Sequence, residues 1–456
     1  MTDRIKQKIH TLIYAQKFSE ILSGAVWSIL ASIVSVGLSF LSSMLIAQWY
    51  GAKVIGILAI LNSFLMIVSI ITVAGMDTAV MRIIPEHLIK YSSSSAAAIY
   101  HKILFIALVL SLLLGTISYH YADSIAEIFF SKPKLSYYFS LSSFFIVFCS
   151  LKKINLQAVR SVKMIKMYCL LQITPQTSNL ILLIAMSMLW TDKDIPIYAL
   201  LLGIALTAIL GWVTIENQLT KQRKPADIIE RTPFNHILSI SFPMFTSSAM
   251  SFLISQSGII LLGMFSSEAE VGYYSIAVRL SLLTSFVLAA INTMTGPKIS
   301  EEFQRGKIEN VFAVAKNASK LIFWTTIPIL LLLIFSGHYI LHHFYGLEFV
   351  KAYPALVILI FGQGVHAISG PTGLFMNMAG SQNQYKNMML IAATLNLVLC
   401  ILLIPKYSYV GAAIASSFSL IFWNITTLIY MIKKYGNVTA YLPLVSRITY
   451  CRQTRE

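Results

Sequence analysis

The sequence is poor in charge: charged residues make up 11% of its 456 residues, whereas 57% are hydrophobic and the mean hydropathy is +0.75. Soluble globular domains carry about 25% charged residues. A chain with so little charge lacks the surface of an ordinary cytosolic enzyme, and it is too apolar to be disordered. Cysteine is also scarce and shows no metal-ligand spacing, which excludes a disulfide-stapled secreted scaffold. We expect Cys149, Cys169, Cys400 and Cys451 to be small apolar fillers.

Motifs of catalysis are lacking as well. The sequence has no phosphate-binding Gly-Lys loop, no paired carboxylates deep in an apolar run and no His-rich zinc spacing. His338, His342 and His343 have a spacing that could bind a metal, but they fall at the outer end of a predicted helix, where we expect a solvated terminus. We therefore expect no enzyme activity, no cofactor and no metal.

What the sequence does contain is apolar runs of about 20 residues, the length that crosses a bilayer as a helix. They predict an all-α integral membrane protein with about twelve transmembrane helices. The N-terminal segment 1–20 is basic and mixed, with no cleavage-type site, so we expect no removable signal peptide. The predicted spans are 21–47, 54–75, 99–119, 135–151, 167–190, 196–215, 237–265, 271–293, 319–345, 353–377, 387–405 and 409–432.

The basic residues of the loops predict the orientation. With both termini cytoplasmic, the inward segments hold 27 of the 34 Lys and Arg residues and the outward loops hold six. This excess follows the positive-inside rule, so the net charge of +16 requires no nucleic acid partner. The densest basic cluster contains Lys152, Lys153 and Arg160. It is either a topology signal that attracts anionic membrane lipids or the cytoplasmic site where an anionic substrate enters.

The chain contains an internal repeat. Segment 49–60 resembles segment 268–277 when Gly56 is aligned with Gly272, an offset close to half the chain, and an apolar span follows each copy. Six predicted spans separate the copies, which gives them the same orientation, and parallel repeats of this kind are typical of transporters with a central cavity. The predicted domains are a basic segment 1–20, a six-helix bundle 21–216, a linker 217–236, a six-helix bundle 237–432 and a basic tail 433–456.

Arg279 is the one formal charge well inside a predicted span, about 12 Å along the helix from its outer end. A charge in hydrocarbon is costly and normally faces protein or a watery cavity. The repeat aligns Arg279 with Ser63, so the architecture itself does not require a charge here. The side chain either snorkels and bonds to neighbouring carbonyls, or lines the cavity and binds phosphate with its paired donors, which we favour.

No carboxylate lies as deep as Arg279. The nearest is Asp77, at the cytoplasmic end of the second predicted span, and it is either an interfacial helix-end residue or a candidate for ion coupling. Uncharged polar residues inside spans either bond between helices or line a hydrophilic lumen for sugar hydroxyls. The stretch 362–371, rich in glycine and ending in proline, predicts a bent helix. The substrate-binding candidates beside Arg279 are Asn62, Gln256, Asn292, Gln363 and His366, and the remaining polar residues expected to be buried are Gln172, Gln176, Asn179, Asn396 and Asn424.

Several short segments stand out by their order and spacing, although each alone is mostly glycine and apolar residues. The segments are YG at 50–51 with Gly56, LQAVR at 156–160, VGYYSIAVRL at 271–280, NTMTGP at 292–297, ISE at 299–301, FGQG at 361–364, MAGS at 378–381, LIP at 403–405 and VGAAIA at 410–415. Together, from about residue 20 to 435, they resemble the Wzx-type polysaccharide flippases of the multidrug/oligosaccharidyl-lipid/polysaccharide exporter superfamily.

This resemblance implies two six-helix bundles around a V-shaped cavity in the bacterial cytoplasmic (inner) membrane. It implies translocation of undecaprenyl-pyrophosphate-linked oligosaccharides from the cytoplasmic to the outer leaflet, for O-antigen (lipopolysaccharide) or capsule synthesis. It also implies a polysaccharide polymerase and a chain-length regulator as partners, and a cationic lumen to which Arg279 belongs. The alternative is a multidrug or cation antiporter of the same superfamily. A membrane glycosyltransferase would need an acidic cluster and an outward loop longer than the segment 120–134, the longest one predicted here.

Overall fold

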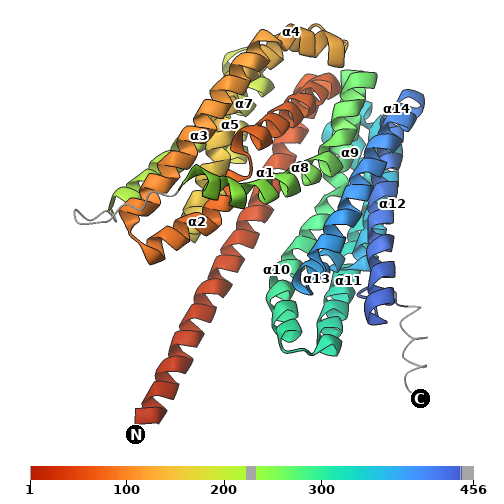
Figure 1. The fold of residues 1–456 in the computed structure, drawn as a ribbon. Coiled ribbons are helices and arrows are strands. Elements are labelled where there is room, and N and C mark those ends of the chain that lie inside the picture. Colours follow the sequence, from red (N-terminus) through yellow and green to blue (C-terminus); the bar gives the residue numbers. More distant parts are fainter. Residues whose placement is uncertain (1, 222–232, 442, 444–456) are drawn as a thin grey trace. The chain divides into compact units, whose positions relative to one another are not determined.

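The computed structural model describes residues 2–221, 233–441 and 443, and within these residues the protein is helical and contains no β-strand. Figure 1 shows the arrangement of the helices. In chain order they are α1 (Thr2–Val73), α2 (Met76–Lys90), α3 (Ser93–His120), α4 (Ala122–Ser124), the π-helical turn η1 (Ile125–Phe129), α5 (Leu135–Ser161), α6 (Ile165–Leu189), α7 (Ile195–Lys221), α8 (Phe234–Phe265), α9 (Glu268–Ser281), α10 (Leu283–Gln304), α11 (Ile308–Ile340), the π-helical turn η2 (Leu341–Tyr345), the 3-10 helix η3 (Leu347–Ala352), α12 (Tyr353–Ser369), α13 (Thr372–Met378) and α14 (Gln382–Tyr435).

Nine helices in the described part of the chain are long and apolar enough to cross a membrane. Two of them, α1 and α14, each contain two predicted spans, because the backbone leaves helical geometry at Gly51 and at Ser408. The predicted span 271–293 is not one helix, since it is divided between α9 and α10 at Leu282. The predicted span 353–377 is likewise divided at Gly370, where α12 ends. The figure of twelve crossings stays a prediction.

Large apolar side chains lie exposed along these helices. Phe105 on α3 is 67% exposed, Phe335 on α11 is 84% exposed and Leu402 on α14 is 59% exposed. Monomeric soluble proteins rarely expose so many large apolar groups, whereas in a bilayer such groups contact lipid tails. The helices also satisfy their own backbone hydrogen bonds, as hydrocarbon requires. The protein is therefore a multi-pass membrane protein.

The chain forms two compact units that do not correspond to two contiguous halves. A short part of α1 belongs to the second unit, and α8 is divided between the two at residue 249. The prediction of two contiguous six-helix bundles thus stays a prediction. Unit 1 comprises residues 1–43, 64–128 and 132–249, and unit 2 comprises residues 44–63, 129–131 and 250–456.

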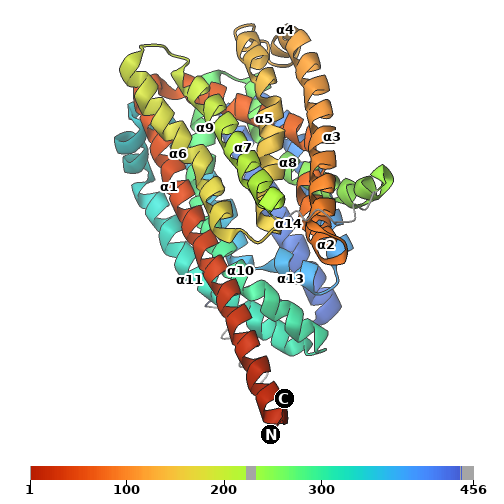
Figure 2. The same cartoon turned by 90° about the vertical axis from the view of Figure 1, so that its left-hand side faces the viewer.

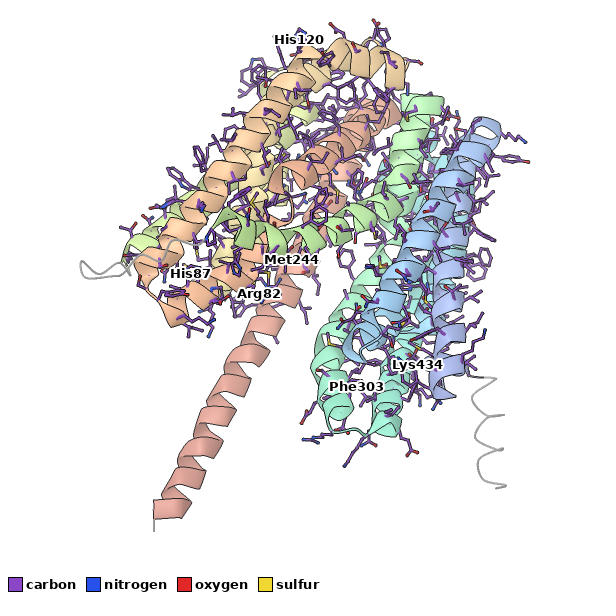
Figure 3. All side chains as sticks on the ribbon, viewed as in Figure 1. Arg82, His87, His120, Met244, Phe303 and Lys434 are labelled. Carbon is purple, nitrogen blue, oxygen red and sulfur yellow. The ribbon has the colours of Figure 1, made fainter. Side chains whose placement is uncertain are left out.

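Unit 1 has a hydrophobic core formed by α2, α3, α5, α6 and α7 (Figure 2). Its largest fully buried side chain is Tyr100, whose hydroxyl donates to Asn155 Oδ1 at 2.7 Å. Met244 of α8 packs against this core. Figure 3 shows His87 on α2 near one end of α3, and His120 at the other end of α3.

Unit 2 contains α9 to α14, and it has a second core around Phe312, Phe375 and Met431. A capping box begins α9: Ser267 accepts from the Glu270 N–H, and the Glu270 carboxylate accepts from the Ser267 N–H at 3.0 Å. Figure 3 places Phe303 of α10 near the same end of the unit as Lys434 of α14. This end corresponds to the predicted cytoplasmic side.

The cysteines are confirmed as buried fillers where the structure describes them. Cys149, Cys169 and Cys400 are buried and form no disulfide. Cys400 donates a weak hydrogen bond to Asn396 Oδ1 at 3.3 Å. Cys451 lies outside the described residues.

Candidate functional site

The predicted site residues separate cleanly between the two units. All six substrate-binding candidates lie in unit 2, although Asn62 is far from the other five in sequence. Asp77 and the basic residues of the predicted cytoplasmic cluster all lie in unit 1.

Arg279 lies in the last turn of α9, before the turn at Leu282 where α9 passes into α10. The residue is exposed, whereas Ala277 and Leu280 beside it are buried. A helix C-terminus carries partial negative charge and favours a cation in its last turn. Tyr345, at the end of η2, is close enough to interact with Arg279 electrostatically. The predicted span 271–293 thus holds an arginine at the end of α9.

The residue that the predicted repeat aligns with Arg279 takes a different role. Ser63 is fully buried and its hydroxyl donates to Gln256 Oε1 at 2.8 Å. Gln256 is half-buried, and this hydrogen bond links its side chain to α1. Asn62, expected to be buried, is exposed, so that expectation is wrong.

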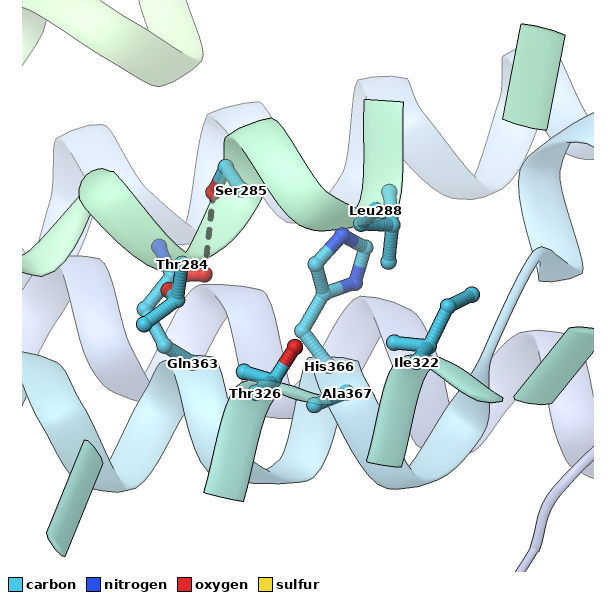
Figure 4. A pocket seen from close by; sticks show the side chains of 8 residues that line it. All are labelled: Thr284, Ser285, Leu288, Ile322, Thr326, Gln363, His366 and Ala367. Atoms are coloured by element: carbon cyan, nitrogen blue, oxygen red, sulfur yellow. Dashed lines mark hydrogen bonds between the residues drawn. The ribbon is translucent and has the colours of Figure 1, made fainter. Parts of the chain in front are cut away.

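Gln363 and His366 lie one turn apart on α12 and line the same narrow pocket against α10 and α11 (Figure 4). Gln363 Oε1 accepts from the Ser285 hydroxyl at 3.2 Å. The pocket encloses about 160 Å³ of empty space, part of it open, and has no room for a water molecule at its centre. The structure therefore brings these two predicted residues together, although not in a cavity that fits a sugar ring.

The hydrogen bonds of Asn424 assign the proton on His366. Asn424 Nδ2 donates to the Leu420 carbonyl at 2.8 Å, which leaves Asn424 Oδ1 as the acceptor at His366 Nδ1, 3.0 Å away. A neutral His366 then carries its proton on Nδ1 and a lone pair on Nε2. Thr326 lines the same pocket, and its buried hydroxyl has no partner among the described residues.

Asn292 is the remaining substrate-binding candidate, and it lies on α10. The side chain is half-buried and Asn292 Oδ1 finds no hydrogen-bond partner in the described part of the chain. A buried amide oxygen without a partner is costly. Asn292 is therefore free to accept a hydrogen bond from a ligand.

In unit 1, Asp77 lies in the first turn of α2, directly after the left-handed Ala74 and Gly75. Asp77 acts electrostatically on Lys153 of α5, so the predicted coupling residue lies within electrostatic range of the predicted cluster. Lys152 and Lys153 are half-buried. Arg160 is exposed and its guanidinium lies over the Tyr168 ring, 5.3 Å from the ring centroid.

Two buried Ser–Asn hydrogen bonds have matching positions in the two units. The Ser42 hydroxyl donates to Asn179 Oδ1 at 2.7 Å in unit 1, and the Ser257 hydroxyl donates to Asn396 Oδ1 at 2.8 Å in unit 2. Ser42 and Ser257 are separated by nearly the offset of the predicted repeat, and so are Asn179 and Asn396. Sequence reasoning identified both asparagines and missed both serines, which comparison at that offset could have found.

Sequence reasoning also missed Glu348, in the 3-10 helix η3 that follows η2. Its carboxylate accepts from the Ala52 N–H at 3.2 Å and from the Tyr273 hydroxyl at 3.0 Å. An acid in a predicted outward loop carries no signal of such long-range contacts. Only the folded chain brings α1, α9 and η3 together.

The three outer histidines do not gather into a metal centre. His338 lies in the last turn of α11, and His342 and His343 lie in η2. The His343 ring stacks on Tyr339 of α11, with the ring centroids 5.4 Å apart. No group of three or more His, Cys, Asp or Glu side chains in the described residues could hold a metal ion.

Comparisons with known proteins agree with this architecture. The structure is similar to that of lipid II flippase MurJ in an inward closed conformation, with a TM-score of 0.72 and 20% identity over 89% of this chain and 87% of the other. It is also similar to an inward-facing multidrug resistance MATE family transporter of the MOP superfamily, with a TM-score of 0.66 and 14% identity over 88% and 96% of the two chains. At these identities the likeness concerns the fold.

Sequence similarity is more specific. The chain is 28% identical over 232 residues to the probable low-salt glycan biosynthesis flippase Agl15 of Haloferax volcanii, which is 50% of this chain and 47% of the relative. The match thus spans about half the length of that relative. The model of the family described as polysaccharide biosynthesis protein matches residues 21–303. The chain therefore belongs to the polysaccharide biosynthesis protein family.

Proposed function

We propose that this protein is a flippase for lipid-linked oligosaccharides. It moves undecaprenyl-pyrophosphate-linked repeat units from the cytoplasmic to the outer leaflet of the bacterial inner membrane, for O-antigen or capsule synthesis. The observation that carries the proposal is Arg279, an exposed residue in the last turn of α9 and within a predicted span. A guanidinium binds phosphate oxygens in pairs, which suits a pyrophosphate headgroup.

The polar candidates of unit 2 complete the substrate site. Asn292 supplies an unpartnered amide oxygen and Asn62 an exposed amide, both able to bond sugar hydroxyls. Gln256 presents its amide nitrogen, because its oxygen already accepts from Ser63. Gln363 and His366 contribute from the edge of their pocket, with the lone pair of His366 Nε2 as an acceptor.

The predicted cytoplasmic end in unit 1 receives the substrate and couples transport to an ion. Lys152, Lys153 and Arg160 attract the anionic headgroup and membrane lipids. Asp77 is electrostatically coupled to Lys153. We assign ion coupling to Asp77, because a headgroup that recruits Lys153 frees this carboxylate for an incoming cation.

The transport cycle proceeds by alternating access of two parallel six-helix bundles with both termini in the cytoplasm. Two observations support the underlying repeat. The Ser42–Asn179 and Ser257–Asn396 hydrogen bonds recur close to the repeat offset. Gly56 and Gly272, aligned by the repeat, pack against each other. A polysaccharide polymerase and a chain-length regulator would consume the flipped units.

The alternative is a multidrug or cation antiporter. The fold of this chain is also similar to that of a multidrug resistance transporter. Binding of a cationic drug requires an available deep carboxylate. Asp77 is the nearest candidate, and it already has Lys153 as an electrostatic partner. The flippase is therefore the better-supported function.

The role of Arg279 is tested in proteoliposomes that contain a fluorescent polyprenyl-pyrophosphate oligosaccharide, by protein-dependent movement between leaflets. Arg279→Ala should slow movement about tenfold or more, because a hydrogen bond to a charged group contributes about 1.5–3 kcal/mol. The rate of movement with Arg279→Lys should lie between those of wild type and Arg279→Ala, because lysine keeps the charge and loses the paired donors. Arg305→Ala is the control, because Arg305 is exposed and pairs with Glu301 and Glu302.

The result that opposes this role is equally clear. If Arg279→Ala moves the lipid at the rate of the control, phosphate is bound elsewhere. A second result would also contradict the proposal. If wild type does not move the lipid and instead exports a cationic dye in response to an ion gradient, the protein is an antiporter.

A further inference from the structure

The helix α1 is broken at Gly51, and the break exposes backbone donors. Gly51 has φ 79° and ψ −179°, a conformation that glycine adopts with little strain. The N–H groups that follow such a break lose their partners one turn earlier in the helix. The chain from Ala52 onward thus begins a new helical segment whose first donors need acceptors from elsewhere.

Glu348 supplies one of these acceptors. Its Oε2 accepts from the Ala52 N–H at 3.2 Å, and its Oε1 accepts from the Tyr273 hydroxyl at 3.0 Å. A carboxylate at a helix N-terminus is also favoured by the helix dipole. One side chain in η3 therefore bonds residues 52 and 273, which lie on α1 and α9. We name Gly51, Ala52, Tyr273 and Glu348 the clasp.

The aromatic neighbours hold the clasp in place. The Tyr273 ring is edge-on to Phe349 and to Tyr409, with both centroid distances 5.9 Å. Gln48 adds a further link, because its Nε2 donates to the Phe344 carbonyl at 3.0 Å. The geometry of the Tyr273 hydroxyl is thus set by packing.

Just beyond the clasp, the two helices meet backbone to backbone. A Cβ on Gly56 would lie 1.7 Å from the Glu268 carbonyl oxygen, and a Cβ on Gly272 would lie 2.2 Å from the Ala52 carbonyl oxygen. Small residues permit such close crossings, but they offer few side-chain contacts that hold two helices together. The specific bonds at this crossing come from Glu348.

We infer that Glu348 is a positioning residue of the transport cycle. The clasp holds residues 52–63, from the first repeat copy, to α9 of the second, and it closes the predicted outer side while it is formed. Opening that side separates the two glycine-faced helices and breaks both bonds of Glu348. The inference rests on the proposed alternating access and concerns which side is open, independently of which substrate is carried.

The experiment measures accessibility from each side of the membrane. Asn62 is exposed on the segment after the clasp, so an Asn62→Cys reporter is placed in full-length protein with Cys451→Ser. The remaining cysteines are buried. Labelling by a membrane-impermeant maleimide is followed in vesicles of both orientations, with Glu348→Ala, Glu348→Gln and Tyr273→Phe. Glu127→Ala is the control, an exposed acid in η1.

We expect Glu348→Ala to increase labelling from the outer side on the order of fivefold, the effect of one net hydrogen bond on an equilibrium. Glu348→Gln should label like wild type, because an amide oxygen accepts from the Ala52 N–H and its NH₂ donates to the Tyr273 oxygen. Tyr273→Phe, which keeps the ring packing, should give a smaller increase. Glu127→Ala should have no effect.

Three results would overturn the inference. Glu348→Ala could label at the wild-type rate, Glu348→Gln could label as fast as Glu348→Ala, or labelling could rise equally from both sides, as in a general loosening of the fold. Lipid movement is measured in protein that keeps Asn62, so the proposed substrate can fail independently. Altered labelling with no lipid movement keeps the clasp and removes the flippase, whereas lipid movement with unaltered labelling does the reverse.

Discussion

At the scale of single residues, the protein places polar groups in hydrocarbon and gives most of them a partner. Buried asparagines accept from serines on another helix, whereas Arg279, the one formal charge well inside a predicted span, is exposed at the end of α9. The free-energy costs of placing an amide and an ionised group in hydrocarbon explain this difference. An amide needs one or two hydrogen bonds, but an ionised group needs a counter-charge, water or a ligand.

The matched asparagines should contribute similarly to stability. Asn179→Ala and Asn396→Ala each remove the acceptor of a buried serine hydroxyl, and we expect each to lower the free energy of unfolding by about 1–2 kcal/mol. Thermal unfolding in detergent measures this, with Asn310→Ala as the exposed control, which loses only a bond to Glu302. A loss from one asparagine and none from the other would argue against equivalent positions.

The stability of the protein should depend on the hydrogen bond that His366 donates to Asn424. His366→Phe leaves Asn424 Oδ1 without its hydrogen bond, and we expect a loss of about 1–3 kcal/mol in stability. His366→Gln retains a donor and should lose less. If the two variants unfold at the same temperature, the bond to Asn424 contributes nothing, and the proton assignment on Nδ1 loses its support.

At the scale of elements, the breaks in the helices are more informative than the helices themselves. The chain leaves helical geometry at Gly51, Gly370 and Ser408, whereas Leu282, between α9 and α10, keeps right-handed helical angles. Each of the three breaks releases backbone groups that something else must satisfy. One of them, Gly51, lies next to Glu348, which has a proposed role.

The glycine crossing predicts a sharp contrast among three glycine substitutions. Gly56→Ala and Gly272→Ala place a Cβ against backbone oxygens and should cost several kcal/mol or force the two helices apart. Gly37→Ala is the matched control on α1, because a Cβ there meets nothing within 4 Å. It should stabilise the exposed helix by about 0.5–1 kcal/mol. Equal unfolding temperatures for all three variants would contradict the close crossing.

Hydropathy predicted where apolar helices lie, because a bilayer imposes length and composition on every helix that crosses it. It foresaw interruptions near Gly51 and Ser408, where polar or small residues separate two runs. It did not foresee the division between α9 and α10 at Leu282, since the leucines around it are typical of a continuous helix.

The candidate site was predictable in part for the same reason. Arg279 was identifiable because a lone charge in an apolar run is costly. Gln363 and His366 were expected near each other from their spacing on one helix. Glu348 and Ser257 act through partners 296 and 139 residues away, so neither carries a local signal.

At the scale of the whole molecule, the proposed cycle requires coupling between ion binding and movement. Asp77→Asn removes the carboxylate that acts on Lys153, while it preserves the shape of the side chain. We expect flipping without an ion gradient to persist within about twofold of wild type, and the acceleration by a gradient to disappear. Initial rates with and without a proton or sodium gradient measure this. An acceleration equal to that of wild type would exclude Asp77 from coupling.

The central claim is that the substrate is a lipid-linked oligosaccharide, and the most direct measurement offers the protein two cargoes in the same proteoliposomes. One is a fluorescent polyprenyl-pyrophosphate oligosaccharide and the other a cationic dye, each compared with protein-free vesicles. We predict protein-dependent movement of the lipid between leaflets and no gradient-driven export of the dye. Export of the dye without movement of the lipid would contradict the account.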